Sequence, residues 1–145
     1  MYDRALLAEK LETVLEALER FPRRTEGISR PEDFRASAQG IDRMDAICMI
    51  LIAAGEEFKN IDRKTEGDLF SRYSGIDWRG AIGLRDVMAH GYFDVNILQL
   101  FSICRDDIPR VIETLRTMIT SRERAWSLSP LKNSFGEIER VRCHN

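Results

Sequence analysis

The chain has 145 residues, of which 43% are hydrophobic and 32% are charged, and its formal net charge is -2. This length and composition are typical of one globular domain and exclude an intrinsically disordered chain. The slight negative charge argues against a protein that coats nucleic acid, because such binding depends on many Lys and Arg contacts to phosphate, but it leaves a local basic cleft open.

Two helices are predicted in the first half of the chain. Apolar residues at three- and four-residue steps predict a helix over about residues 3–21, which Pro22 should end. The sequence SRPE at residues 29–32 has the spacing of a capping box, so we expect a second helix to begin there and to run to about Lys59. A short helical turn is expected at about residues 68–73.

A third helix is predicted over residues 78–90, with Asp77 as its N-cap and Gly91 as its stop. A last helical region should span about residues 95–124. Pro109 should break or kink that region, and Asp106 or Asp107 should cap its second piece.

The hydrophobic period never changes from helical to strand-like along the chain. The sequence therefore predicts an all-α fold, an antiparallel up-and-down bundle of four to five helices. Residues 1–125 should form the helical domain, and residues 126–145 should form a loosely ordered C-terminal tail.

No cofactor, metal or membrane contact is expected. Cys48, Cys104 and Cys143 lack the spacing of zinc ligands and are odd in number, which argues against a disulfide framework and favours a cytoplasmic setting. The acidic N-terminus is unlike a signal peptide, and the longest apolar run, residues 46–54, is too short to span a bilayer. Neither a metal-ligand cluster nor a Gly-rich phosphate loop is present in the sequence.

Arg85 falls in the middle of the apolar arc of the third helix. A guanidinium in that position must be paired or must open onto a cleft, because an unpaired buried charge is very costly. Asp45 and Glu56 of the second helix are its candidate partners. A structural ion pair and a functional cation therefore both remain open.

Asp86 and His90 are four residues apart and share a helix face, where a carboxylate would fix the imidazole tautomer. An ordinary solvated ion pair has the same spacing. Gly80 and Gly83 lie beside this face and would allow another helix to approach closely. Because Arg85 and His90 are about 140° apart around the axis, two copies of the helix across a dyad aim them at one phosphate more easily than one copy does. A catalytic role therefore predicts a homodimer.

The segment from Arg85 to Tyr92 has the pattern Arg, four residues, His, one residue, Tyr. In this pattern the chain resembles the HepT-like toxins of the HEPN (higher eukaryotes and prokaryotes nucleotide-binding) superfamily. The resemblance covers about residues 3–120. It extends to the family's Gly-Glu pair late in the second helix, its Trp before the Arg, its Asp after the Tyr and a later Pro, which are here Gly55-Glu56, Trp78, Asp94 and Pro109.

The resemblance implies a metal-independent endoribonuclease toxin of a type VII-like toxin–antitoxin system, working on RNA as a homodimer. Arg85 would stabilise the charge that develops on the phosphorane, and His90 would serve as general base or acid while the ribose 2′-hydroxyl attacks its own phosphate. Asp86 completes the expected catalytic set, and Glu56 would support it. HepT-like chains usually have Asn where this chain has Asp86, and the added charge would repel phosphate and slow the reaction.

The partner that the resemblance implies is a cognate minimal nucleotidyltransferase antitoxin, which would neutralise the toxin by attaching AMP to Tyr92. Gly91 would leave that phenol accessible by ending the helix. Two other classes of function stay open. One is a non-catalytic HEPN module that binds a minimal nucleotidyltransferase and nucleotide, and the other is an unrelated structural four-helix dimer. The intact set of Arg85, His90 and Tyr92 favours the ribonuclease.

Overall fold

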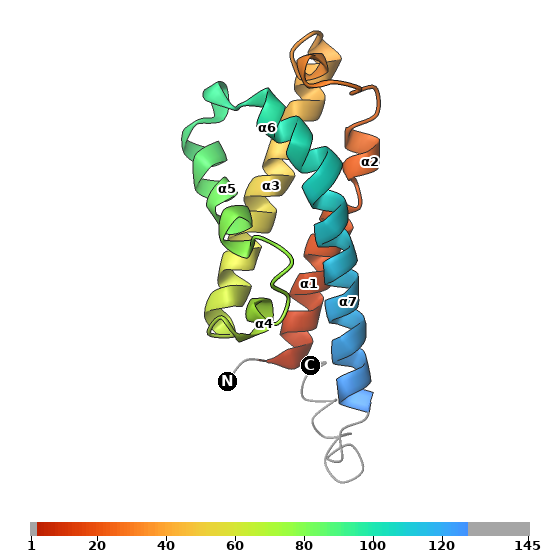
Figure 1. Ribbon diagram of the computed structural model, residues 1–145, viewed down its shortest axis with the longest axis vertical. Coiled ribbons are helices and arrows are strands. Elements are labelled where there is room, and N and C mark those ends of the chain that lie inside the picture. The colour runs from red at the N-terminus through yellow and green to blue at the C-terminus, as the bar shows by residue number, and fades with distance from the viewer. Residues whose placement is uncertain (1–2, 128–145) are drawn as a thin grey trace.

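The computed structural model of the chain describes residues 3–127, and these residues form helices and turns without a strand (Figure 1). The all-α prediction is therefore confirmed. The predicted tail lies almost wholly outside the described residues. The long helices are α1 (Arg4–Leu18), α3 (Ala38–Lys64), α5 (Trp78–His90) and α7 (Ile108–Ser127), and the shorter elements are α2 (Phe21–Arg24), η1 (Pro31–Phe34), α4 (Asp68–Ser71), η2 (Tyr92–Asp94), α6 (Ile97–Ser102) and η3 (Ile103–Asp107).

The four long helices alternate in direction along the bundle, as the colours of Figure 1 show. The central helix α3 packs against both α1 and α5, and α7 packs along α1. Buried apolar side chains of α1, α3 and α7 fill the space between them. No helix among the described residues has the length and hydropathy needed to cross a membrane.

The first helix ends earlier than predicted. α1 stops at Leu18, and Pro22 lies in the first turn of the separate short helix α2 instead of marking the end of α1. Proline is tolerated there because the first N–H groups of a helix have no partner within it.

The predicted capping box at residues 29–32 is wrong. The Asp33 carboxylate, not that of Glu32, accepts hydrogen bonds from the backbone N–H groups of Ser29 and Arg30, at 2.8 and 3.1 Å. The segment that it closes is the single 3-10 turn η1, not the start of the long helix. Because Asp33 and not Glu32 accepts these hydrogen bonds, the segment forms a short 3-10 turn and not the first turn of a long helix.

The long helix α3 begins at Ala38, with Ser37 as its N-cap, and continues to Lys64 instead of about Lys59. The Ser37 hydroxyl accepts a hydrogen bond from the backbone N–H of Gly40 at 3.0 Å. A Cβ atom on Gly40 would collide with the carbonyl oxygen of Asp33. The start of α3 therefore depends on a glycine that lets η1 fold back onto the helix.

At Pro109, where a break or kink was predicted, the helical chain continues but has a π-helical irregularity. The chain runs from α6 into α7 through η3, a π-helical stretch that ends two residues before the proline. Proline lacks an N–H, and its ring would clash with the carbonyl four residues earlier in an α-helix, whereas a wider π turn accommodates both effects. Asp106 and Asp107 cap nothing, and the Asp106 carboxylate accepts hydrogen bonds from Arg105.

An aromatic cluster fixes the start of α5. The rings of Phe70 and Trp78 stack with centroids 4.1 Å apart, and Phe58 meets both edge-on. The indole Nε1–H of Trp78 donates a hydrogen bond to the Tyr73 carbonyl at 2.9 Å. The first residue of α5 is thus buried and oriented.

The closest approach between α3 and α5 occurs at Gly55. A Cβ atom on Gly55 would lie 3.0 Å from the Arg85 Cβ and 3.1 Å from the Ala81 carbonyl oxygen. The sequence assigned such a role to Gly80 and Gly83. Within this chain, however, the atoms nearest to a Cβ on Gly80 belong to the capping Asp77, and a Cβ on Gly83 meets nothing within 4 Å. The small residue that the contact requires is therefore on α3.

We predict different effects on stability for two Gly→Ala substitutions. Gly83→Ala should raise the free energy of unfolding by about 1 kcal/mol, because alanine favours the helix. Gly55→Ala should give a protein less stable than Gly83→Ala by about 1–3 kcal/mol, because the added methyl overpacks the contact with α5. Urea unfolding followed by circular dichroism at low protein concentration measures both values. Equal stabilities of the two variants would contradict this account of the contact.

Candidate active site

The helix α5 has the predicted bounds, and its last turn exposes His90 to solvent. At its start, the Asp77 carboxylate accepts a hydrogen bond from the Gly80 N–H at 2.9 Å. At its end, the Gly91 N–H donates to the Val87 carbonyl at 2.9 Å, and the 3-10 turn η2 follows. Gly91 has φ -129°, so it does not stop the helix by a left-handed turn. A Cβ at this residue would lie 3.1 Å from the Val87 carbonyl oxygen.

Arg85 lies at the boundary between α3 and α5, with 38% of its side chain exposed. Its Nε is 3.1 Å from Glu56 Oε2, and its Nη1 donates a hydrogen bond to Asp86 Oδ1 at 2.8 Å. Of the two predicted partners, Glu56 forms an ion pair with Arg85, whereas Asp45 is exposed and lies outside the pair. The hydrogen bond to Asp86 and the nearby Glu56 raise the pKa of Arg85 and keep its guanidinium charged.

The carboxylate of Asp86 turns toward Arg85 and not toward His90. The hydrogen bond from Arg85 holds the pKa of the Asp86 carboxyl below its ordinary value. The predicted contact between this carboxylate and the imidazole does not form. Asp86 instead meets His90 through its backbone, because His90 Nδ1 lies 2.9 Å from the Asp86 carbonyl oxygen.

His90 is exposed at the last turn of α5, and its hydrogen bond determines its tautomer. A carbonyl oxygen only accepts, so Nδ1 carries the proton in this bond. In the neutral ring, Nε2 is then left without a proton. Such a nitrogen can accept a proton from a substrate hydroxyl, as a general base must.

Tyr92 begins η2 and is half-buried against the core. Its ring meets that of Phe93 edge-on, with centroids 5.4 Å apart. Arg35, which the sequence did not single out, donates a hydrogen bond from Nη2 to the Val95 carbonyl at 2.6 Å and so holds the end of this turn. Sixty residues separate Arg35 from Val95 in the sequence, so no local pattern indicated this contact.

Asp86 therefore links the predicted site residues. Its carboxylate contacts Arg85, which in turn pairs with Glu56, and its carbonyl contacts His90. Tyr92 follows across Gly91 but makes no contact of this kind with the other four. The structure thus brings Glu56, Arg85, Asp86 and His90 into one chain of contacts.

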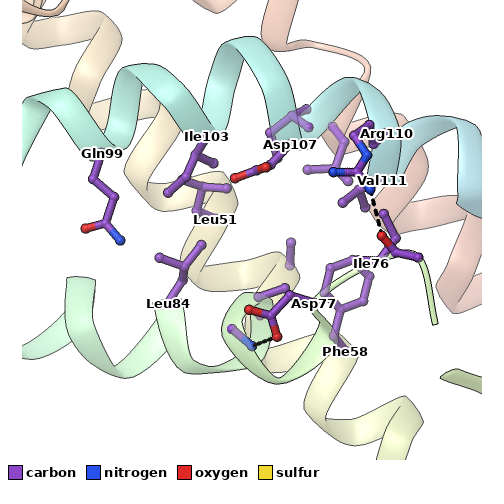
Figure 2. Close-up of a pocket in the computed structure, with 17 residues that line it drawn as sticks. Leu51, Phe58, Ile76, Asp77, Leu84, Gln99, Ile103, Asp107, Arg110 and Val111 are labelled. Carbon is purple, nitrogen blue, oxygen red and sulfur yellow. Dashed lines mark hydrogen bonds between the residues drawn. The ribbon is translucent and has the colours of Figure 1, made fainter. Parts of the chain in front are cut away.

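A cavity of about 360 Å³ lies between α5, α3 and the α6–α7 segment, and Gly55 and Leu84, the neighbours of Glu56 and Arg85 in the chain, line it (Figure 2). Leu51, Phe58 and Ile103 contribute to its apolar lining, whereas Arg85, His90 and Tyr92 contribute nothing to it. Its polar residues include Asp77, Gln99, Asp107 and Arg110, and Arg110 Nη2 donates to the Gly75 carbonyl at 2.8 Å.

Cys48 and Cys104 carry free thiols. Burial raises the pKa of Cys48 to about 11 and that of Cys104 to about 12, so both stay protonated near neutral pH and are poor nucleophiles. Among residues 3–127, no group of three or more His, Cys, Asp and Glu side chains is arranged to hold a metal ion.

Residues 14–118 match the protein-family model described as Ribonuclease HepT-like. Among curated proteins, the chain is similar to "Putative RNase MJ1380" of Methanocaldococcus jannaschii, with 26% identity over 61 residues, which is 42% of this chain and 56% of that protein. It is also similar to "Putative RNase MJ0127" of the same organism, with 28% identity over 78 residues, 54% of this chain and 61% of that protein. The chain thus spans little more than half the length of these relatives. No solved structure matches it significantly.

We predict that the pKa of Asp86 depends on Arg85. Arg85→Gln removes the charged hydrogen-bond donor, so the pKa of the Asp86 carboxyl should rise toward its ordinary value. Carbon-detected NMR titration of the aspartate carboxyl groups measures this change. Asp106, whose pKa is lowered by its neighbour Arg105, provides the control and should titrate identically in both proteins. A low Asp86 pKa in the Arg85→Gln protein would show that another group holds it down.

Proposed function

Because the chain belongs to the Ribonuclease HepT-like family, we propose that it is an endoribonuclease whose reaction uses Arg85 and His90. One observation in particular supports this proposal. The Arg85 guanidinium is held between the carboxylates of Glu56 and Asp86. The carbonyl of Asp86 also contacts the exposed imidazole of His90, whose Nε2 is free to accept a proton. RNA cleavage needs these two kinds of group, a fixed positive charge and a proton acceptor.

In the proposed reaction, the ribose 2′-hydroxyl oxygen attacks the adjacent phosphorus while His90 Nε2 takes its proton. Negative charge develops on the phosphorane, and Arg85 stabilises it. The bond from phosphorus to the 5′-oxygen then breaks, the leaving oxygen takes a proton from water, and His90 returns its proton to the solvent. The products are a 2′,3′-cyclic phosphate and a 5′-hydroxyl end. The chemistry that we propose uses protein groups and no metal ion.

Arg85 keeps donors available for a phosphate. A guanidinium has five N–H groups. The contact with Glu56 uses the one on Nε, and the contact with Asp86 uses one of the two on Nη1. In this proposal, Glu56 and Asp86 position the guanidinium, and Asp86 also orients His90 through its carbonyl. The negative charge of Asp86 opposes phosphate binding, so we propose that it slows the reaction relative to relatives with Asn.

We further propose that the active form is a homodimer in which two α5 helices face one another. The exposed side of α5 supports this arrangement. Nothing lies within 4 Å of a Cβ placed on Gly83, and Val87 is 61% exposed. A second helix can approach over Gly83 and Val87, and we propose that the His90 of one chain then lies near the Arg85 guanidinium of the other, which turns toward Asp86.

We predict that Arg85→Ala and His90→Ala each reduce cleavage of single-stranded RNA by about 100- to 1,000-fold, because each removes a preorganised charge or a proton acceptor. Mass spectrometry of the wild-type products should find 2′,3′-cyclic phosphate ends, with or without EDTA. Arg105→Ala is the matched control, because Arg105 pairs with its neighbour Asp106 at 3.0 Å in the same way but lies outside the site.

Full cleavage by the His90→Ala protein, or loss of cleavage in EDTA, would contradict the mechanism. The same two variants test the homodimer. When Arg85→Ala and His90→Ala chains are mixed, a shared site regains one intact pair and part of the activity. Two independent sites would leave the mixture inactive.

We propose that the protein acts in the cytoplasm as the toxin of a toxin–antitoxin pair and that a cognate minimal nucleotidyltransferase controls it through Tyr92. Tyr92 follows His90 by two residues, and an AMP group there would bring a phosphate charge near Arg85. One observation favours the alternative, a non-catalytic module that binds this nucleotidyltransferase and nucleotide. Glu56 and Asp86 together offset the charge of Arg85.

We predict that co-expression with the cognate nucleotidyltransferase and ATP adds about 329 Da per AMP to the phenol of Tyr92. Tyr92→Phe should remain toxic and escape neutralisation, whereas Tyr73→Phe should still gain the mass. Intact-mass analysis and growth assays measure the two effects. Neutralisation without added mass would refute control by AMP transfer, and a wild-type protein that binds the partner but never cleaves RNA would support the non-catalytic module.

A further inference from the structure

Phe93 is the most exposed large hydrophobic side chain among the described residues, with 91% of its surface accessible. Single exposed apolar residues are common on proteins and need no function. Phe93 differs from Met49 and Leu98, the next most exposed, in its position, because it lies three residues after His90 in the turn that ends α5.

The turn that carries Phe93 is held in place on both sides. The Asp94 N–H donates to the Gly91 carbonyl at 2.9 Å, and the Val95 N–H donates to the Tyr92 carbonyl at 3.3 Å. Val95 is buried, and its carbonyl accepts the hydrogen bond from Arg35. An aromatic ring on a fixed turn loses little conformational entropy when a ligand covers it.

The ring of Phe93 remains open to a planar ligand. Its contact with Tyr92 is edge-to-face, with an interplanar angle of 66°, so the two rings do not stack on one another. Three residues span at most about 11 Å between Cα atoms, so a base next to a phosphate at His90 lies within reach of Phe93.

The negative charge around the site limits phosphate binding, so base stacking would contribute more to RNA affinity here. Phosphate contacts usually dominate RNA affinity, but this chain has a net charge of -2, and Arg85 is already paired with Glu56 and Asp86. Asp94 adds another negative charge beside Phe93. Stacking of a base on an aromatic ring depends little on charge and therefore suits this surface.

We propose that Phe93 is the stacking platform for an unpaired RNA base next to the scissile phosphate, an inference that rests on the proposed ribonuclease function. Unpaired bases are recognised in this way on aromatic side chains, whereas the bases of a duplex are covered by their neighbours. Phe93 therefore selects single-stranded RNA.

The test measures binding without cleavage. In the His90→Ala background, fluorescence anisotropy gives the Kd for a labelled short single-stranded RNA and for the same sequence as a duplex. Phe93→Ala should raise the single-strand Kd by about 5- to 150-fold, the loss expected for one stacked base, and should leave the duplex Kd unchanged. Phe93→Trp should keep the affinity. Leu98→Ala, which removes a 64% exposed apolar side chain from α6, is the matched control and should have no effect.

An unchanged single-strand Kd in Phe93→Ala, together with RNA cleavage by the wild type, would overturn the stacking role and leave the proposed function standing. A protein that neither binds nor cleaves RNA would overturn the proposed function itself. Light scattering of the same variants distinguishes the remaining possibility. A lower molecular mass for Phe93→Ala with an unchanged Kd would assign the ring to a protein interface and would also overturn the stacking role.

Discussion

The close approach of α3 and α5 at Gly55 is the constraint on which the site depends. Because Gly55 has no side chain, the Cβ of Arg85 can rest against α3, and the guanidinium then reaches Glu56, the next residue of that helix. One helix supplies both the gap and the carboxylate that holds the arginine. A side chain at position 55 would press on the Arg85 Cβ and on the Ala81 carbonyl, so α5 would have to shift away from α3.

The two ends of α5 have different environments, and this difference places the chemistry. The first turn is held by the capping Asp77 and by Trp78 in its aromatic cluster. In the last turn, Met88 is buried but Val87, Ala89 and His90 are exposed, and the His90 imidazole contacts the Asp86 carbonyl. The buried Met88 anchors the last turn in the core, so α5 presents the exposed imidazole of His90 to solvent from a fixed position.

Local signals predicted α5 well. Asp77 and Gly91 mark its bounds because a cap and a helix stop act through neighbouring residues. The errors arose where distant or three-dimensional effects decide. The N–H groups of Ser29 and Arg30 donate to Asp33 and not to Glu32, and a π-helical stretch before Pro109 lets the helix continue through the proline. The sequence placed the Asp86 carboxylate on the face of His90, but a guanidinium held nearby by α3 attracts it more strongly.

The π-helical stretch before α7 has a consequence for the wall of the cavity. Gln99, Ile103, Asp107 and Val111 all line that wall, at intervals of four residues. In an unbroken α-helix, four residues exceed one turn by about 40°, so three such intervals would rotate the last side chain by about 120° away from the first. A π turn contains more residues and cancels part of this drift. The stretch η3 thus acts like one residue inserted into the helix, and it keeps these four side chains on the side of the helix that faces the cavity. A regular α-helix would need one residue fewer in this segment to keep the same side chains on that side.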